Sequence, residues 1–241
     1  ACTNMHLWDI DETRNLVLQL HGRAQLERAR PALRSVADRI SYARIHIQAL
    51  EAVINTYLSP ARQTQELVEI VFSDSEDARN EFNLFLRKVG AHATAGIQSL
   101  HAIGDLLSHA IYYSLAINVT EPIEEKKVSV GTVVNRLKGH TNTEALCLLL
   151  SSFGPNGDFQ HIAALSNRAK HRSLVFPSLN EDQTGQQEER LAVLIEAFTH
   201  NKANYPAVPA QAFLVAQFEA VGRKTIEAGN ELNAILGRSA T

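Results

Sequence analysis

The longest regular pattern in this chain lies within residues 74–118, where apolar residues recur at spacings of three and four. This spacing places them on one face of an α-helix, and the stripe holds its phase throughout. Ser73 and Glu76 fit a capping box at its start. The pattern predicts one nearly continuous helix of roughly 65 Å, which needs long partner helices to cover its apolar face. The stripe consists of Phe82, Phe85, Leu86, Val89, Ala93, Gly96, Leu100, Ile103, Gly104, Leu107 and Ile111.

Similar periodicity predicts further helices on both sides of this stretch. Residues 11–29 form one, which leads into a second that ends before Pro60, with a kink at Pro31. A C-terminal helix contains the apolar stripe from Leu214 to Leu236. Shorter helices are expected at 62–72, 129–138 (with Ser129 as the cap), 142–153 and 158–172.

Two segments interrupt the helical pattern. The sequence predicts a polar linker over residues 119–128. It predicts a small irregular or β-hairpin insertion over residues 173–206. Within the insertion, Leu191–Ile195 could pair with Leu174–Phe176. The predicted fold is therefore all-α: one domain over 1–241, an up-and-down bundle of long antiparallel helices.

Composition narrows the classes of function. A net charge of −3 argues against broad DNA binding, which needs a large basic face. There is no apolar run long enough for a membrane span, and the first residues show no basic-then-apolar leader pattern. Cys2 and Cys147 form neither a disulfide framework nor a zinc site by themselves. A cytoplasmic protein without membrane association is expected.

The densest polar cluster lies at the end of the helix predicted for residues 158–172. No acidic residue occurs between Asp158 and Glu181, although the whole chain is acidic. Such a local excess of positive charge is typical of a site for an anion. The cluster consists of Asn167, Arg168, Lys170, His171 and Arg172.

Two interpretations of this cluster stay open. In the first it is a solvated last helical turn, where the helix dipole favours cations. In the second it binds an anion or carries out catalysis: Lys170 and Arg172 hold a phosphate, and His171 acts as general acid or base. On a helical wheel Asn167 shares a ridge with His171, while Arg168 and Arg172 flank them beside His161, a candidate for substrate binding.

A second group of polar residues falls inside the long apolar helix. His101, Asp105 and His109 recur at intervals of four within residues 97–117, which are otherwise apolar almost all round. A carboxylate in such surroundings needs partners, which indicates a structural network. Alternatively Asp105 orients a catalytic histidine such as His171, or the three residues form a metal site in the bundle.

The run Leu165–Val175 also resembles the Asn-x-x-Lys-His-Arg signature of bacterial helical proteins in the HEPN superfamily of RNases and defence toxins. This resemblance implies a helical bundle, often dimeric, that cleaves RNA without a metal ion or other cofactor. His171 would be the acid or base, and Arg168 or Arg172 would stabilise the phosphate. The family motif has four to six residues between Arg and His, whereas only two residues lie between Arg168 and His171.

Two main hypotheses of function follow. The first is a HEPN-like protein that binds or cleaves RNA, or binds another anionic ligand, in a defence or toxin–antitoxin setting, with homodimers formed through its helices. The second is a noncatalytic interaction or scaffolding protein. A metal- or ligand-binding bundle built on His101, Asp105 and His109 is a third hypothesis.

Overall fold

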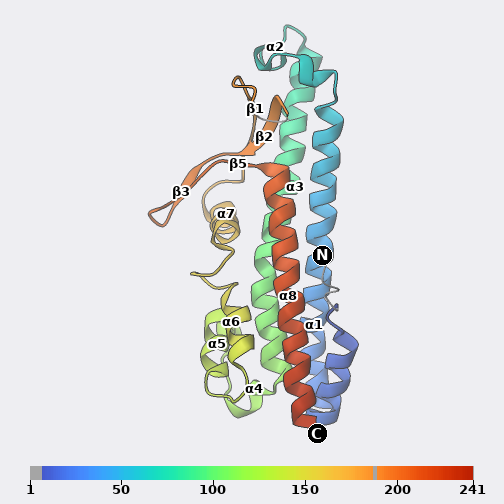
Figure 1. Ribbon diagram of the computed structural model, residues 1–241, viewed down its shortest axis with the longest axis vertical. Coiled ribbons are helices and arrows are strands. Elements are labelled where there is room, and N and C mark those ends of the chain that lie inside the picture. The colour runs from blue at the N-terminus through green and yellow to red at the C-terminus, as the bar shows by residue number, and fades with distance from the viewer. Residues whose placement is uncertain (1–6, 187–188, 241) are drawn as a thin grey trace. The chain divides into compact units, whose positions relative to one another are not determined.

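The computed structural model describes residues 7–186 and 189–240, and these residues are mostly helical, with eight α-helices and five short strands (Figure 1). The helices are α1 (Ile10–Tyr57), α2 (Leu67–Val71), α3 (Glu76–Ser114), α4 (Ile117–Thr120), α5 (Val130–Leu137), α6 (Glu144–Ser151), α7 (Gln160–His171) and α8 (Ala210–Ala240). The strands are β1 (Pro177–Glu181), β2 (Leu191–Ile195), β3 (Phe198–His200), β4 (Ala203–Tyr205) and β5 (Val208–Pro209). Short 3₁₀ turns occupy Arg62–Thr64 and Glu125–Lys127.

These elements fall into two compact units. The first unit comprises 1–41, 99–160 and 219–241, and the second comprises 42–98 and 161–218. Cys2, together with the start of the chain, lies outside the described residues, as do two positions of the predicted insertion, 187–188.

The predicted helices are largely confirmed. The apolar stripe becomes the single helix α3, and the C-terminal pattern becomes α8. Ser129 caps α5 as expected, because its side chain accepts a hydrogen bond from the backbone N–H of Thr132. The segment predicted as a polar linker contains the end of α4 and a 3₁₀ turn, so it is more ordered than the sequence indicated.

The kink in the first long helix lies at Gly22, and the prediction that it would lie at Pro31 was wrong. Gly22 has φ 78° and ψ 177°, so the helical backbone is broken there, whereas Pro31 lies inside the helix. Only glycine adopts such angles readily, because a side chain would clash with the backbone.

The first unit has a continuous apolar core. A side chain on Gly104 of α3 would place its Cβ 2.8 Å from Cβ of Phe153, so the missing side chain lets the residues after α6 approach α3. α5 and α6 lie side by side within this unit (Figure 1). The core includes Val17, Leu33 and Val36 of α1, Leu107 and Ile111 of α3, Val133 and Leu137 of α5, Leu146 and Leu150 of α6, and Leu232 and Leu236 of α8.

A polar network ties the residues before α1 to α8 within the first unit. Trp8 Nε1 donates to the hydroxyl of Thr13 at 2.9 Å, and that hydroxyl donates to Asn233 Oδ1 at 2.5 Å. The side-chain amide of Asn233 in turn donates to the backbone carbonyl of Asp9 at 2.9 Å. Thr13 and Asn233 are buried, so these bonds satisfy groups that water cannot reach.

The second unit contains both sheets. β2 pairs antiparallel with β1 and with β5, and β3 pairs antiparallel with β4. The predicted hairpin partner of β2 was three residues early: residues 177–181 pair with it instead of 174–176. Val175 is buried, and its carbonyl lies 3.3 Å from where a Cβ on Gly90 would be, so this stretch runs against α3 before the strand begins.

Candidate functional site

The candidate site at the end of α7 belongs to the second unit. α7 buries Ile162 and Leu165 on one face, as the apolar positions of its sequence predict. The helix ends at the cluster, where the backbone N–H groups of Arg172 and Ser173 both bond to the carbonyl of Arg168, at 2.9 and 3.1 Å. The polar residues after Leu165 are therefore presented at a helix C-terminus, where positive charge is favoured.

The structure divides the predicted cluster by exposure. Lys170, His171 and Arg172 are exposed, whereas Asn167 and Arg168 are half-buried. We call the three exposed residues the basic tip of α7. The tip can reach a ligand without any rearrangement, but its histidine is open to water rather than enclosed in a catalytic pocket.

Arg168 is engaged in local structure. Its Nε donates to the hydroxyl of Ser173 at 3.0 Å, and its guanidinium carbon lies 5.2 Å from the ring centre of Phe198 in β3. A cation over an aromatic face is stabilised by the ring quadrupole. Arg168 thus anchors the end of α7 to β3 and contributes less free charge than the sequence suggested.

His161 lies apart from the tip, at the other end of α7. Its ring centre is 4.7 to 5.6 Å from those of Phe198, Tyr205 and Phe213, which form an aromatic cage. Burial lowers the pKa of His161, because the cage penalises the charged imidazolium. Its Nε2 is buried without a hydrogen-bond partner among the described residues, so His161 is placed as a neutral packing residue.

The predicted network on α3 belongs to the first unit. Asp105 is exposed, so water solvates its carboxylate and the prediction that it is buried and needs protein partners was wrong. His101 and His109 are half-buried, and the ring of His109 lies 6.2 Å from that of Tyr113. Within residues 7–186 and 189–240, no three histidine, cysteine or acidic side chains gather as a metal site would require.

Two functional features near the tip were missed from the sequence. Leu174 and Phe176, which the sequence placed in a possible hairpin, are 59% and 60% exposed. Glu196, distant in sequence, lines a cleft of about 30 Å³ together with Arg168 and Phe176. The basic segment after Asp158 therefore has an acidic residue near it in the structure, because the chain after β2 brings Glu196 to the same cleft.

A larger half-open groove begins at the same segment. It has a volume of about 540 Å³ between α3 and the residues that follow α7. Its surface is mainly apolar, with Arg87 at the rim and the hydroxyl of Thr94 buried without a hydrogen-bond partner among the described residues. The groove is lined by Leu86, Arg87, Gly90, Ala91, Thr94, Ala95, Gln98, Leu174, Val175, Phe176 and Pro177.

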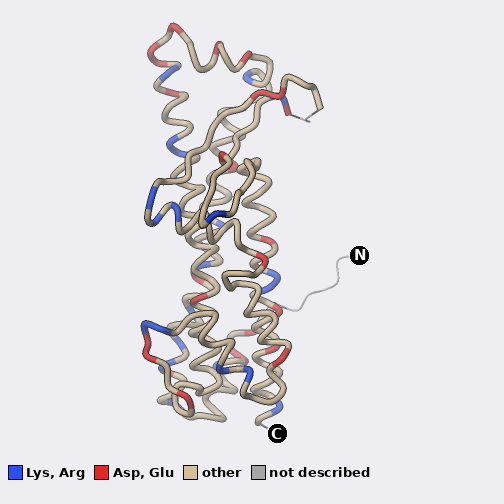
Figure 2. The backbone as a smooth tube through the Cα atoms, turned by 90° about the vertical axis from the view of Figure 1, so that its left-hand side faces the viewer, with Lys and Arg blue, Asp and Glu red and all other residues tan. Residues whose placement is uncertain are grey.

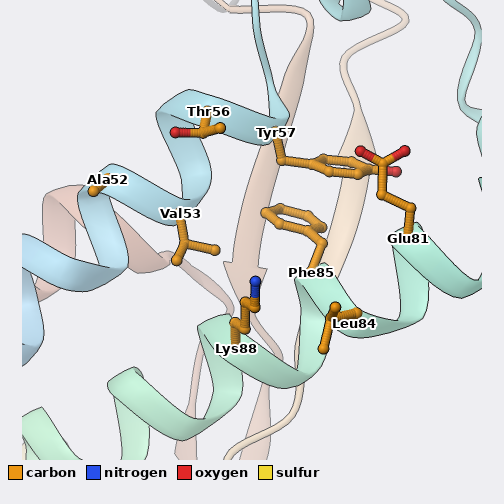
Figure 3. Close-up of a pocket in the computed structure, with 8 residues that line it drawn as sticks. All are labelled: Ala52, Val53, Thr56, Tyr57, Glu81, Leu84, Phe85 and Lys88. Atoms are coloured by element: carbon orange, nitrogen blue, oxygen red, sulfur yellow. The ribbon is translucent and has the colours of Figure 1, made fainter.

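A second cavity of about 350 Å³ lies between α1 and α3 in the second unit (Figure 3). Tyr57 and Phe85 stack there with ring centres 3.9 Å apart. Arg62 donates to the Tyr57 hydroxyl at 3.0 Å and to the carboxylate of Glu81 at 3.1 Å. Burial raises the pKa of Tyr57, and its hydroxyl already has a partner, so this arrangement closes the end of a helix pair rather than supplying a reactive group.

Basic and acidic residues are interspersed over most of the described backbone, where segments of Lys or Arg lie near segments of Asp or Glu (Figure 2). Glu124, for example, pairs with Lys126 and Lys127 at 2.7 and 2.9 Å. Any binding of an anion must therefore come from local groups such as the basic tip of α7.

Similarity to known proteins does not indicate a function for these residues. Among the described residues, no helix combines the length and the apolar character that crossing a bilayer requires. No family model, no curated protein and no solved structure matches the chain. The function must therefore be argued from the residues of the site itself.

Proposed function

We propose that this protein binds single-stranded RNA through the basic tip of α7 and the exposed ring of Phe176. The observation that carries the proposal is the closeness along the chain of three exposed basic or titratable residues, Lys170, His171 and Arg172, to Phe176, an aromatic residue that is 60% exposed. Cations bind phosphates, and an exposed ring offers a base a stacking surface.

The spacing along the chain suits one short oligonucleotide. Phe176 is the fourth residue after Arg172, so their Cα atoms lie at most about 14 Å apart, at roughly 3.5 Å per residue. One strand of a few nucleotides can thus contact the tip with its phosphates and Phe176 with a base. Stacking of this kind contributes about 1–3 kcal/mol per base and tolerates any sequence.

The HEPN-like resemblance supports a sharper form of the proposal, which is metal-independent RNA cleavage in a defence or toxin–antitoxin setting. His171 would transfer the proton as general acid or base, and Arg172 would stabilise charge on the phosphate. Asn167, half-buried one turn before His171, would position the imidazole. The resemblance would also make the helices an up-and-down bundle that forms homodimers.

One observation favours a different function, that of a noncatalytic interaction protein. The groove of about 540 Å³ is mainly apolar, and two of its lining residues, Leu174 and Phe176, are strongly exposed. Exposed apolar surface beside a groove is typical of protein recognition sites. In this alternative the basic tip would contact acidic residues of a protein partner and RNA binding would be absent.

The test is fluorescence anisotropy with a labelled single-stranded RNA at several salt concentrations. Lys170→Glu combined with Arg172→Glu should abolish binding at moderate salt, because two phosphate contacts become repulsive. The neutral pair Lys170→Gln and Arg172→Gln should lower the slope of log K against log salt by about 1.4, at roughly 0.7 per lost contact. Phe176→Ala should weaken binding about 5- to 150-fold without changing that slope.

The matched control is Arg23→Glu with Lys138→Glu, which makes the same charge change at exposed positions in the first unit. If this control weakens binding as much as the α7 double variant does, net charge rather than the tip is responsible. For cleavage, His171→Ala should remove activity in the presence of a chelator while its circular dichroism stays unchanged. Cleavage that survives this substitution refutes the catalytic form and leaves the binding proposal intact.

A further inference from the structure

A histidine pair elsewhere in the second unit has a geometry that the proposed function does not use. His46 of α1 and His92 of α3 point their Nδ1 atoms at each other across 3.3 Å. Their ring centres are 5.6 Å apart, and both residues are half-buried. A Cβ on Gly96, one turn after His92, would lie 3.8 Å from the Cβ of His46, which is ordinary van der Waals contact between the two helices.

The distance between the two nitrogens matches the distance between two nitrogen ligands of one metal ion. Zinc binds histidine nitrogen at about 2.0–2.1 Å with tetrahedral angles, which places two ligand nitrogens about 3.3–3.4 Å apart. Without an ion the two nitrogens share a hydrogen bond, in which the tautomer decides which imidazole donates. The Nδ1 atoms of His46 and His92 are thus already spaced for a shared ion, with little movement of either helix.

We propose that His46 and His92 form a two-histidine site for a divalent transition-metal ion, with water in the remaining coordination positions. Imidazole nitrogen suits copper, nickel and zinc, whereas magnesium and calcium prefer oxygen. The described residues bring no third ligating side chain into a common group with them, so the site keeps open positions. Such an ion would clamp α1 to α3 within the second unit and offer an exchangeable water.

The experiment is a calorimetric titration of tag-free, chelator-treated protein with zinc, nickel and copper salts. One ion should bind per chain, and copper should bind more tightly than nickel or zinc. His46→Ala and His92→Ala should each weaken binding at least tenfold. The matched control is His200→Ala, which removes a half-buried histidine of β3 in the same unit and should leave the affinity unchanged.

A second measurement on the unaltered chain covers the case in which the alanine variants fold poorly. In ¹⁵N spectra of labelled histidines, stoichiometric zinc should move the Nδ1 signals of two residues and leave the Nε2 signals less affected. The proposal is overturned if no ion binds saturably, if binding persists in both alanine variants, or if the nitrogen signals of other histidines move instead. None of these results depends on RNA binding, so this site and the proposed function can fail separately.

Discussion

Because Trp8 packs on Gly229, the substitution Gly229→Ala should destabilise the protein when Trp8 is present and stabilise it when Trp8 is replaced. A Cβ on Gly229 would lie 2.0 Å from Cδ2 of the Trp8 ring, a distance that no relaxation of the helix can absorb. Gly229→Ala must therefore displace Trp8 from α8. The three nearest atoms at Gly229 all belong to that ring, so removing the Trp8 side chain removes these contacts.

The magnitude follows from what Trp8 buries. A buried aromatic side chain covers about 150–250 Å², worth about 4–6 kcal/mol at roughly 25 cal/mol per Å². Trp8 is half-buried, so losing its contact costs about 2–3 kcal/mol, with about 1 kcal/mol more for its hydrogen bond to Thr13. Alanine stabilises a helix interior by about 1 kcal/mol relative to glycine, which offsets part of this loss. Gly229→Ala should therefore destabilise the unaltered chain by about 2–3 kcal/mol.

In a Trp8→Ala background the same substitution should stabilise the protein by about 1 kcal/mol, because only the gain in helix propensity remains. The assay is guanidinium unfolding followed by circular dichroism at 222 nm for the two single variants, the double variant and the parent. The coupling energy between the two positions should be about 3–4 kcal/mol. Equal destabilisation by Gly229→Ala in both backgrounds would refute the contact.

Two further predictions concern Gly22 and His161. Gly22→Ala should destabilise the first unit by about 1–3 kcal/mol, because φ 78° with ψ 177° suits only glycine even though the site is sterically open. An unchanged midpoint in denaturant unfolding would contradict this. The pKa of His161 is lowered by burial, so the unfolded chain takes up a proton there more readily than the folded chain as pH falls through about 6.5. Stability from His161 is thus present above that pH and lost below it. Between pH 8 and pH 5.5 the free energy of unfolding in urea should fall less in His161→Phe than in the parent protein. The control His171→Phe, at an exposed position, should show the same fall as the parent. Equal falls in all three proteins would contradict the role of the cage.

The long helices were predictable because their information is local. The stripe through Phe85, Leu100 and Ile111 repeats with the helical period, and neighbouring turns suffice to define α3. The kink was not predictable in the same way. Proline disfavours the interior of a helix, yet Pro31 lies inside α1 and the break lies at Gly22.

The candidate site was predictable in its residues but not in its environment. The exposure of Lys170 and His171 follows from their place at a helix end. In contrast, the cage around His161 and the approach of Glu196 depend on strands distant in sequence from α7. Helical spacing also could not show that Asp105 is exposed, because exposure depends on which neighbouring segments cover that face of α3.

Trp8 is the single tryptophan of the chain, and it docks entirely within the first unit. Its emission spectrum is therefore an intrinsic optical probe of one unit, needing no label. A red shift of this emission should report undocking from α8. Circular dichroism at 222 nm reports the helices of both units. Denaturation recorded by both signals would show whether the first unit loses its structure at the same denaturant concentration as the helices as a whole.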